Sequence, residues 1–276
     1  GAGRSGTNIL RDVLTTIPGV GTWPCDEINY IWRHGNRSWE NDEFDASHAR
    51  PEVKQYILKA FDHAANSGHY EWILEKTCAN SVRVPFINCV LPEAHYVFIV
   101  RDGRDVIASA LRRWSAPLDL RYIFKKARFV PPTDVAFYAS KYILNRLTSF
   151  TNHDGRLASW GPRCIGLKEI LNNHGLISAC AYQWARCVEQ AASALAKIPQ
   201  DRIIKLRYED FVRHPVNNLG RICDFIDKPL PDKVAEAAKK LVSPVSVGKW
   251  RTDLSESELQ PAFPFIQSTL QQYGYV

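Results

Sequence analysis

Apolar and polar positions along the chain follow two different periods, and these periods predict strands and helices in alternation. Short apolar runs bounded by turn residues predict four strands, over residues 70–74, 96–100, 164–167 and 203–206. Apolar residues at helical spacing predict helices over residues 8–16, 51–65, 105–114, 137–150, 178–195 and 216–226. Strands that alternate with helices form parallel sheets covered on both faces. The pattern therefore predicts an α/β fold with a doubly wound parallel sheet and helices on both faces.

The chain opens with a glycine-rich turn, Gly1 to Thr7, directly before the first predicted helix. Turns of this kind normally connect a buried strand to a helix. We therefore expect a first strand immediately before Gly1, in addition to the strands within the printed sequence.

Polar residues gather where the predicted strands end. Five such clusters cover residues 4–7, 75–77, 101–105, 168–169 and 208–210. Ligands bind at the carboxyl ends of the strands in an open parallel sheet, so we expect these clusters to meet on one rim. Residues 115–162 are richer in basic, aromatic and proline residues than their flanks, and we expect a lid or an acceptor-binding insertion there.

The composition is that of a single globular domain over residues 1–276. The chain is 45% hydrophobic and 23% charged, which excludes disordered, collagen-like and coiled-coil proteins. Its net charge of +6 suits small anionic ligands at least as well as nucleic acid. Seven cysteines, an odd number without a CxxC pair, favour a reducing compartment. No apolar run approaches the ~20 residues that cross a bilayer, and no signal peptide is present, so we expect a cytoplasmic protein or the luminal domain of a longer anchored one.

The glycine-rich turn has the composition of a phosphate-binding loop. Its backbone N–H groups and the N-terminus of the following helix can face an anion. Gly1 and Gly6 have the spacing of a Walker A motif, but Thr7 stands where that motif has lysine, and Arg4 is the only cation. A loop without that lysine suits a donor with less charge to neutralise than ATP. The alternative is a plain turn that caps a helix.

A second anion site is predicted after the strand over residues 96–100. Arg101 leaves the strand as a bidentate donor, Asp102 or Asp105 can cap the next helix, and Ser109 adds a hydroxyl. Together these groups can form a pocket for a phosphate dianion. The structural alternative is an ion pair between Arg101 and Asp105. Two anion sites on one rim argue against an accidental arrangement.

These residues resemble the nucleotide motifs of sulfotransferases that use PAPS (3′-phosphoadenosine 5′-phosphosulfate). Residues 3–10 are similar to the 5′-phosphosulfate loop of that family, and residues 101–109 to its 3′-phosphate motif, an arginine with a serine eight positions later. The resemblance is closest to tyrosylprotein and related bacterial sulfotransferases. It extends over nearly the whole chain through shorter motifs in the same order. These are Asp26-Glu27, Glu75-Lys76-Thr77, Trp184-Ala185-Arg186, Leu206-Arg207-Tyr208-Glu209-Asp210, His214-Pro215 and Ser246-Val247-Gly248-Lys249-Trp250-Arg251.

The resemblance implies a P-loop-type fold and in-line transfer of a sulfuryl group from PAPS to a hydroxyl, less often to an amine. The product nucleotide is then PAP (3′-phosphoadenosine 5′-phosphate). It implies three catalytic residues: Glu27 as general base, and Lys76 with Ser246 as stabilisers of charge on the leaving nucleotide. The residues implied for cofactor binding are Arg4, Ser5, Gly6, Thr7, Asn8, Arg101, Ser109, Arg186, Tyr208, Gly248, Lys249, Trp250 and Arg251. No metal is implied, because a sulfuryl group carries less negative charge than a phosphoryl group.

The identity of the base stays open at this stage. Asp26 lies beside Glu27 and could serve instead, and some histidines are further candidates. These are His34, His48, His153 and His174. For each histidine the alternative is a plain structural or surface role.

The acceptor is the least determined part of the prediction. Aromatic and basic side chains could line a channel for a small-molecule, saccharide or peptide hydroxyl acceptor. They are Trp23, Tyr30, Trp32, Trp39, Arg112, Arg113, Trp114, Arg121, Tyr122, Lys125, Lys126 and Arg128. The alternative is an aromatic core with a solvated charged face. We expect no membrane segment and no nucleic-acid partner, and a homodimer is among the oligomeric states left open.

Two other functions are weighed against sulfuryl transfer. The chain could be a P-loop small-molecule kinase, which would need ATP and magnesium. It could also be a module that binds nucleic acid or a protein partner through the basic stretch 112–128, with a steep dependence of binding on salt.

Overall fold

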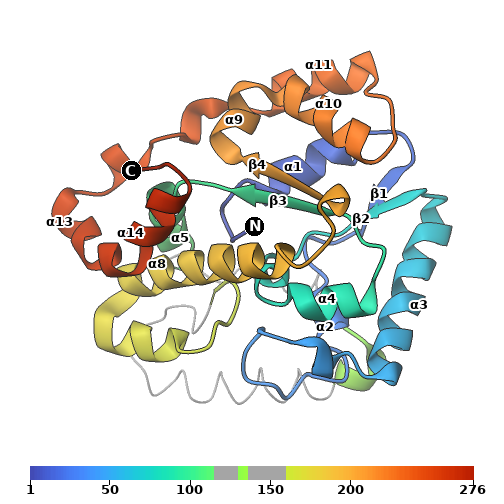
Figure 1. Cartoon of the computed structure of the whole chain (residues 1–276), viewed down its shortest axis with the longest axis horizontal. Coiled ribbons are helices and arrows are strands. Elements are labelled where there is room, and N and C mark those ends of the chain that lie inside the picture. Colours follow the sequence, from blue (N-terminus) through green and yellow to red (C-terminus); the bar gives the residue numbers. More distant parts are fainter. Residues whose placement is uncertain (115–129, 136–159) are drawn as a thin grey trace.

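The computed structural model describes residues 1–114, 130–135 and 160–276 of the chain (Figure 1). The strands in these residues form two parallel pairs. In one pair, β1 (Val20–Thr22) runs beside β2 (Trp72–Leu74), with Val20 opposite Trp72. In the other, β3 (Tyr96–Val100) runs beside β4 (Ile203–Arg207), with Tyr96 opposite Ile203.

Helices cover both faces of the β3–β4 pair. Figure 1 shows α8 along one face, with α1, α9 and α10 on the other. The α-helices of the described residues are α1 (Thr7–Leu14), α2 (Asn29–Trp32), α3 (Pro51–Gly68), α4 (Val84–Val90), α5 (Gly103–Trp114), α8 (Leu167–Leu195), α9 (Tyr208–Arg213), α10 (Pro215–Phe225), α11 (Asp232–Leu241), α12 (Trp250–Asp253), α13 (Glu256–Leu259) and α14 (Phe263–Gln272). Strands and helices in this order give an α/β fold, as the sequence predicts. None of these helices is long and apolar enough to cross a bilayer.

The side chains of β3 alternate between two apolar clusters, as expected for a strand that is buried on both faces. Phe98 and Val100 pack with residues of α5, α8 and α14. Ile99 points the other way and packs with residues of α1, α10 and α11. A third cluster joins α2, α3 and α4 around Trp32 and Phe86. β3 is therefore held from both sides, and its carboxyl end is a fixed point for the residues that follow.

The turn after β3 shows why α5 starts where it does. The Asp102 side chain accepts a hydrogen bond of 2.9 Å from the backbone N–H of Arg104, which caps the first turn of α5. The same carboxylate also binds the guanidinium of Arg104, with an N–O distance of 2.8 Å. Of the two acids considered as caps from the sequence, Asp102 is the one that caps the helix.

Several elements differ from the prediction. The strand over residues 164–167 is wrong: Gly166 takes a left-handed φ of 77° and Leu167 begins α8. The apolar residues Cys164, Ile165 and Leu167 resemble a short strand in the sequence, but Cys164 and Leu167 are buried three positions apart, with Ile165 and Gly166 exposed between them. The short strand β1 was not predicted, and α8 starts earlier than residue 178, with a break at Gly175 where φ is 79°. The predicted helix 137–150 lies outside the described residues.

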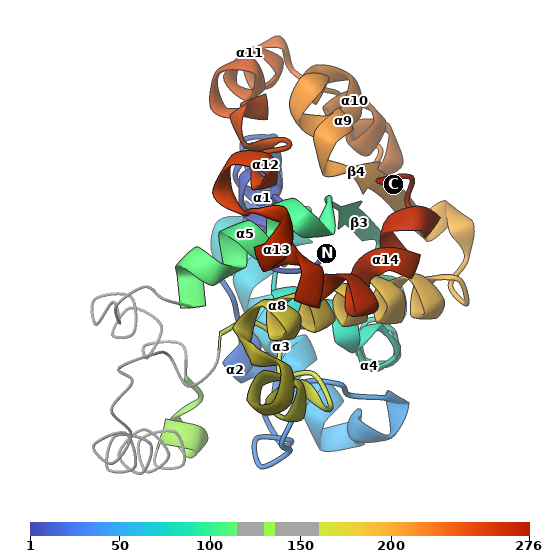
Figure 2. The same ribbon diagram turned by 90° about the vertical axis from the view of Figure 1, so that its left-hand side faces the viewer.

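The predicted single sheet is also not observed as such. Within the described residues the two strand pairs are not hydrogen-bonded to each other. Gly1, the first residue, lies next to β3: a Cβ built on it would be 2.3 Å from the carbonyl oxygen of Ile99. Figures 1 and 2 both place this end of the chain between β3 and α8.

Candidate functional site

The glycine-rich loop bends tightly in front of α1. Gly6, the residue before the helix, has φ of 84°, a conformation that side-chain-bearing residues rarely adopt. A Cβ at this position would also lie 2.3 Å from the ring of Tyr208. Only glycine fits here, because both the backbone conformation and the neighbouring ring exclude a side chain. The loop and the N-terminus of α1 thus present backbone N–H groups where an anion can bind.

A pocket of about 990 Å³ opens at the carboxyl ends of β2, β3 and β4. Four of the five clusters predicted to share one rim contribute to its wall. The prediction is wrong for the fifth, because Lys168 and Glu169 lie in the first turn of α8 and not in the wall. The predicted site residues in its wall are Arg4, Gly6, Thr7, Asn8, Glu27, Lys76, Arg101, Ser109, Tyr208, Ser246 and Lys249. In the described residues no group of three or more His, Cys, Asp or Glu side chains could hold a metal ion.

The two predicted anion motifs meet in this pocket. Nε of Arg4, in the glycine-rich loop, donates to Oγ of Ser109 in α5 at 2.8 Å. Nη1 of Arg101 donates to the carbonyl oxygen of Arg4 at 3.0 Å. The ion pair between Arg101 and Asp105 that the sequence offered as an alternative is also present, at 3.5 Å. The guanidinium of Arg101 lies over the ring of Tyr208, 4.4 Å from its centroid.

Like charges gather around Arg4. Burial and the nearby cations Arg113, Arg101 and Arg112 lower the pKa of the Arg4 guanidinium. Arg112 is paired with Asp253, and Arg101 with Asp105. An anion bound in this pocket would offset the repulsion among these cations.

A second group of side chains lies beside the loop, at the ends of β1 and β2. Oε1 of Glu27 accepts hydrogen bonds from Nζ of Lys76 at 3.1 Å and from the backbone N–H of Cys78 at 3.2 Å. Burial lowers the pKa of Lys76, but Cys78, Glu27 and Asp26 together raise it above its ordinary value. The lysine therefore keeps its charge. Asp26, the other candidate base, binds Nη1 of Arg11 at 2.6 Å.

The remaining predicted catalytic residue, Ser246, comes from the C-terminal part of the chain. Its hydroxyl lies 2.7 Å from the hydroxyl of Tyr208. The segment that carries it is held by Asp105 in α5, whose carboxylate accepts hydrogen bonds from the backbone N–H groups of Gly248 at 2.8 Å and Trp250 at 2.9 Å. Figure 2 shows the resulting position of α12 beside α5.

Some residues predicted to bind the cofactor do not lie in the pocket wall. Arg186 forms a bidentate ion pair with Glu43, with N–O distances of 3.0 and 2.7 Å. Ser5, although it is part of the glycine-rich loop, is completely buried. Gly248 and Trp250 bind Asp105 through their backbones, and Arg251 stacks on the Trp250 ring at 4.6 Å. These residues support the site without lining it.

Of the four histidines considered as bases, the three that the structure describes do not lie in the pocket wall. His34 binds Asp134 at 3.0 Å, and His48 binds Asp45 at 2.9 Å. His174 packs against the ring of Phe265. His153 lies outside the described residues.

The residues considered for the acceptor channel divide into three groups. Tyr30, Arg112 and Arg113 line the pocket. Trp32 and Trp114 are buried in the core, Trp23 packs on Phe61, and Trp39 is exposed beside His48. Arg121, Tyr122, Lys125, Lys126 and Arg128 lie outside the described residues.

Sequence reasoning missed several parts of the pocket. The pairing of Arg11 with Asp26 and the clamp formed by Asp105 are two of them. Trp160 and Arg163 also line the pocket, next to Asp42. Their positions depend on contacts between distant segments of the chain, and no local sequence pattern indicated them.

Comparison with known proteins identifies a family and several solved structures that share this architecture. The chain matches the model of the Sulfotransferase family over residues 1–142 and 162–232. It is similar in structure to the sulfotransferase domain from the curacin biosynthetic pathway, with a TM-score of 0.58 and 13% sequence identity over 98% of this chain and 95% of that chain. For the sulfotransferase domain from the Synechococcus PCC 7002 olefin synthase the TM-score is 0.57 and the identity 15%, over 98% of this chain and 92% of that one. For sulfotransferase STF9 from Mycobacterium avium the values are 0.53 and 13%, over 98% and 75%.

No curated protein sequence matches the chain. At 13–15% identity the similarity to these solved structures shows a common fold, but it does not show a common substrate or common site residues. The family match is broader: it takes in the glycine-rich loop, the segments that carry Glu27 and Lys76, the Arg101 to Ser109 motif and β4. This chain belongs to the sulfotransferase family, whose members transfer sulfuryl groups.

Proposed function

We propose that this sulfotransferase takes its sulfuryl group from PAPS and transfers it to a hydroxyl acceptor. One observation carries the proposal: the glycine-rich loop and the Arg101 to Ser109 motif are joined by the Arg4–Ser109 hydrogen bond of 2.8 Å. A donor with an anionic group on each side of its ribose would contact both motifs at once. ATP, which has no 3′-phosphate, would leave the second motif without a ligand.

The charges of the pocket support such a donor. The backbone N–H groups of the loop and the N-terminus of α1 would hold the 5′-phosphosulfate. Arg4, Arg101 and Ser109 would hold the 3′-phosphate, with the hydroxyl of Tyr208 and the ammonium of Lys249 nearby. A bound 3′-phosphate would replace the repulsion among the arginines with charge-assisted hydrogen bonds.

The Glu27 and Lys76 pair supplies the groups that the chemistry needs. The acceptor hydroxyl forms a bond to sulfur, the bond from sulfur to the 5′-phosphate oxygen breaks, and PAP leaves with the bonding electrons. Glu27 would take the proton that the hydroxyl loses. Lys76, with Ser246, would donate to the oxygen on which charge develops. Since Nζ of Lys76 lies 3.1 Å from Glu27, base and stabiliser flank the same point in the pocket.

The acceptor would enter on the side of the pocket that carries Glu27. This part of the wall includes Asn29, Tyr30 and Trp160, which combine hydrogen-bonding groups with aromatic surfaces. Such a mixture suits a small molecule, saccharide or peptide with a free hydroxyl. No metal takes part in this scheme.

The proposal is tested by calorimetric binding of PAP and of ADP, followed by turnover with labelled PAPS, both in the presence of EDTA. We expect PAP to bind at least about tenfold more tightly than ADP, because one charge-assisted contact contributes roughly 1.5–3 kcal/mol. Equal affinities would reject the 3′-phosphate site. Turnover of ATP that requires magnesium would favour a kinase, and salt-dependent binding of polynucleotides with no nucleotide preference would favour a binding module.

A further inference from the structure

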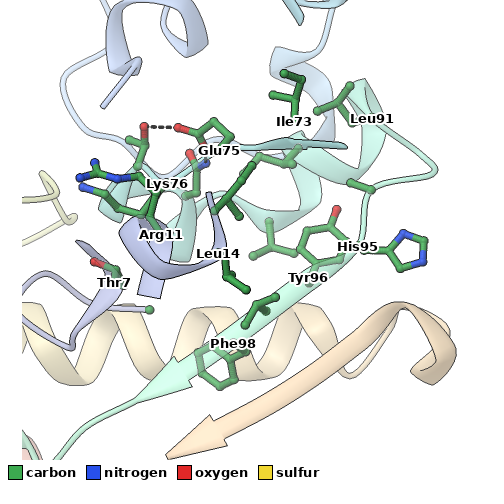
Figure 3. Close-up of a pocket in the computed structure, with 18 of the residues that line it drawn as sticks. Thr7, Arg11, Leu14, Ile73, Glu75, Lys76, Leu91, His95, Tyr96 and Phe98 are labelled. Atoms are coloured by element: carbon green, nitrogen blue, oxygen red, sulfur yellow. Dashed lines mark hydrogen bonds between the residues drawn. The ribbon is translucent and has the colours of Figure 1, made fainter. Parts of the chain in front are cut away.

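Glu75 and Thr77 follow β2 and have no part in the chemistry proposed above. Neither residue lies in the pocket wall. The buried hydroxyl of Thr77 donates to Oε1 of Glu75 at 2.5 Å and accepts from the backbone N–H of Ile28 at 3.2 Å. Figure 3 shows Glu75 and Lys76 beside a neighbouring cavity, with the hydrogen bond between Thr77 and Glu75 as a dashed line. Thr77 therefore connects the end of β2 to the residue that directly follows Glu27.

Thr77 occupies a position in which a threonine hydroxyl usually has a different role. It is the residue before a short 3₁₀-helix, Cys78–Val82. A threonine in that place normally caps the helix by accepting a hydrogen bond from one of its first N–H groups. The Thr77 side chain makes no such bond. Its hydroxyl holds instead a segment that lies 49 positions earlier in the chain.

The direction of these hydrogen bonds is set in the core. Arg83 is completely buried, and its guanidinium, which can only donate, binds Oδ1 of Asn80 through Nε at 2.9 Å and Nη2 at 2.7 Å. The amide nitrogen of Asn80 therefore faces Glu75, and it donates to Oε2 of that side chain. Burial lowers the pKa of Arg83 to about 10, so the guanidinium keeps its charge at neutral pH.

Glu75 in turn determines how the Thr77 hydroxyl is oriented. Burial raises the pKa of the Glu75 carboxyl, while the Thr77 hydroxyl and the charge of Arg83 oppose that rise. In its charged form Glu75 can only accept hydrogen bonds, so the Thr77 proton points toward Glu75. The oxygen of Thr77 then accepts from the N–H of Ile28, which can only donate. The contacts from Arg83 to Ile28 therefore agree in a single orientation.

The end of β2 holds Glu27 by both its side chain and the adjacent backbone. Nζ of Lys76 and the backbone N–H of Cys78 bind the carboxylate of Glu27. Thr77, which lies between these two residues, binds the backbone of Ile28. A general base acts only within hydrogen-bonding reach of the proton that it takes, and a displacement of about 1 Å can lower a rate about a hundredfold. The contact made by Thr77 thus bears on the reach of Glu27.

We propose that Thr77 is a positioning residue for Glu27, and that Glu75, Asn80 and Arg83 hold its hydroxyl in the orientation that this role requires. Thr77 itself touches neither the acceptor nor PAPS. The inference rests on the proposed function, in which Glu27 is the general base. It predicts that loss of the Thr77 hydroxyl slows turnover without weakening the binding of PAP, and does so only while Glu27 is present.

The test compares Thr77→Val, which removes the hydroxyl at nearly the same shape, with Thr77→Ser, which keeps it. Thr269→Val is the matched control, because Thr269 of α14 is also buried and also donates to a glutamate, Glu189, outside the pocket wall. Turnover of labelled PAPS is measured with 4-hydroxybenzyl alcohol, a probe that has one phenolic and one aliphatic hydroxyl. Binding of PAP is measured by calorimetry.

We expect Thr77→Val to lower kcat at least about tenfold, while the Kd of PAP stays within about threefold. Thr77→Ser should keep kcat within about threefold. Both valine variants should unfold about 2–4 °C lower, since each loses a buried hydrogen bond, but Thr269→Val should keep its kcat. Equal losses of kcat in the two valine variants would indicate general destabilisation, and a normal kcat in Thr77→Val would show that Thr77 positions nothing; either result overturns the proposal.

Combination with Glu27→Gln separates this proposal from the proposed function. If Thr77 acts through Glu27, Thr77→Val should lower the kcat of the Glu27→Gln variant by less than about twofold, because residues that act together have non-additive effects. A further tenfold loss would show that Thr77 acts elsewhere and would reject the proposal. A Glu27→Gln variant with normal kcat would instead reject Glu27 as the base.

Hydrogen exchange tests the contact itself, whatever donor or acceptor the enzyme uses. Thr77→Val should speed the exchange of a peptide that covers residues 25–32 at least about tenfold, because the N–H of Ile28 loses its acceptor. Thr269→Val should leave this peptide unchanged. Equal exchange in the original protein and in Thr77→Val would mean that Thr77 does not hold this segment, and the proposal would be wrong even if Glu27 is the base.

Discussion

Arg4 offers the sharpest test of how the donor pocket works. Its guanidinium contacts Ser109, and burial together with repulsion from three other arginines lowers its pKa. Replacement by glutamine keeps most of the side chain and its hydrogen-bonding capacity but removes the charge. The backbone at residue 4 has φ of 66°, and glutamine is no worse than arginine in that conformation.

The expected size of the effect follows from the contact that is lost. A hydrogen bond to a charged group contributes roughly 1.5–3 kcal/mol, so the Arg4→Gln variant should bind PAP about 10- to 150-fold more weakly. ADP lacks the 3′-phosphate, and its affinity should change by less than about threefold. The variant should therefore bind PAP more weakly, but the ligand-free variant should not be less stable than the original protein. Because burial and like charges disfavour the cation in the folded protein, its removal should leave the unfolding temperature without ligand equal or higher.

The measurement is calorimetric titration of PAP and ADP into the variant, with thermal unfolding of the ligand-free protein. Arg221→Gln is a matched control, because Arg221 is an exposed arginine of α10 that contacts Asn218 away from the pocket. The control should leave both affinities unchanged. An Arg4→Gln variant that loses ADP and PAP affinity equally would refute the assignment of Arg4 to the 3′-phosphate. A variant that is clearly less stable would refute the repulsion argument.

Three further predictions address the other parts of the site. Glu27→Gln should lower kcat by at least about a hundredfold while PAP affinity stays within a few-fold, since a general base contributes about 10²–10⁴ in rate and does not touch PAP; near-normal kcat would remove Glu27 from the mechanism. Arg186→Ala should lower the free energy of unfolding by about 1 kcal/mol, because it breaks the partly buried pair with Glu43, yet leave the Kd of PAP unchanged in titration; a tenfold weaker Kd would return Arg186 to the donor site. Gly6→Ala should destabilise the protein by at least about 1–2 kcal/mol in urea unfolding, because its φ is positive and its Cβ would meet Tyr208, and an unchanged midpoint would contradict this account.

The sequence was most informative where one physical rule dominates. β3 and β4 are runs of buried apolar residues, and the rule that polar clusters meet at the carboxyl ends of parallel strands correctly brought Arg4 and Arg101 together. It was least informative where an apolar run is too short to show its period. Cys164, Ile165 and Leu167 read as a short strand in the sequence, but in the structure Gly166 is left-handed and Leu167 begins α8.

Side-chain partners were predicted less well than elements. The resemblance implies that Arg186 binds the cofactor, and the structure pairs it with Glu43, which is 143 positions away in the sequence. Nothing in the local sequence indicates which of two anions, a carboxylate or a ligand, an arginine will meet. The same limit applies to Asp105, whose helix position was predicted but whose contacts with Gly248 and Trp250 were not.

The Asp105 carboxylate also bears on how this enzyme could be re-engineered. Its side chain is 1% exposed and holds, through hydrogen bonds from two backbone N–H groups, the stretch of chain that carries Ser246 and Lys249 into the pocket. A loop transplanted into positions 244–253 from another sulfotransferase would inherit those two bonds whatever its side chains, provided that its backbone follows the same path. The contacts that Ser246 and Lys249 make in the pocket could then be varied by exchange of that loop alone, whereas any exchange of α5 would have to keep an acid at position 105.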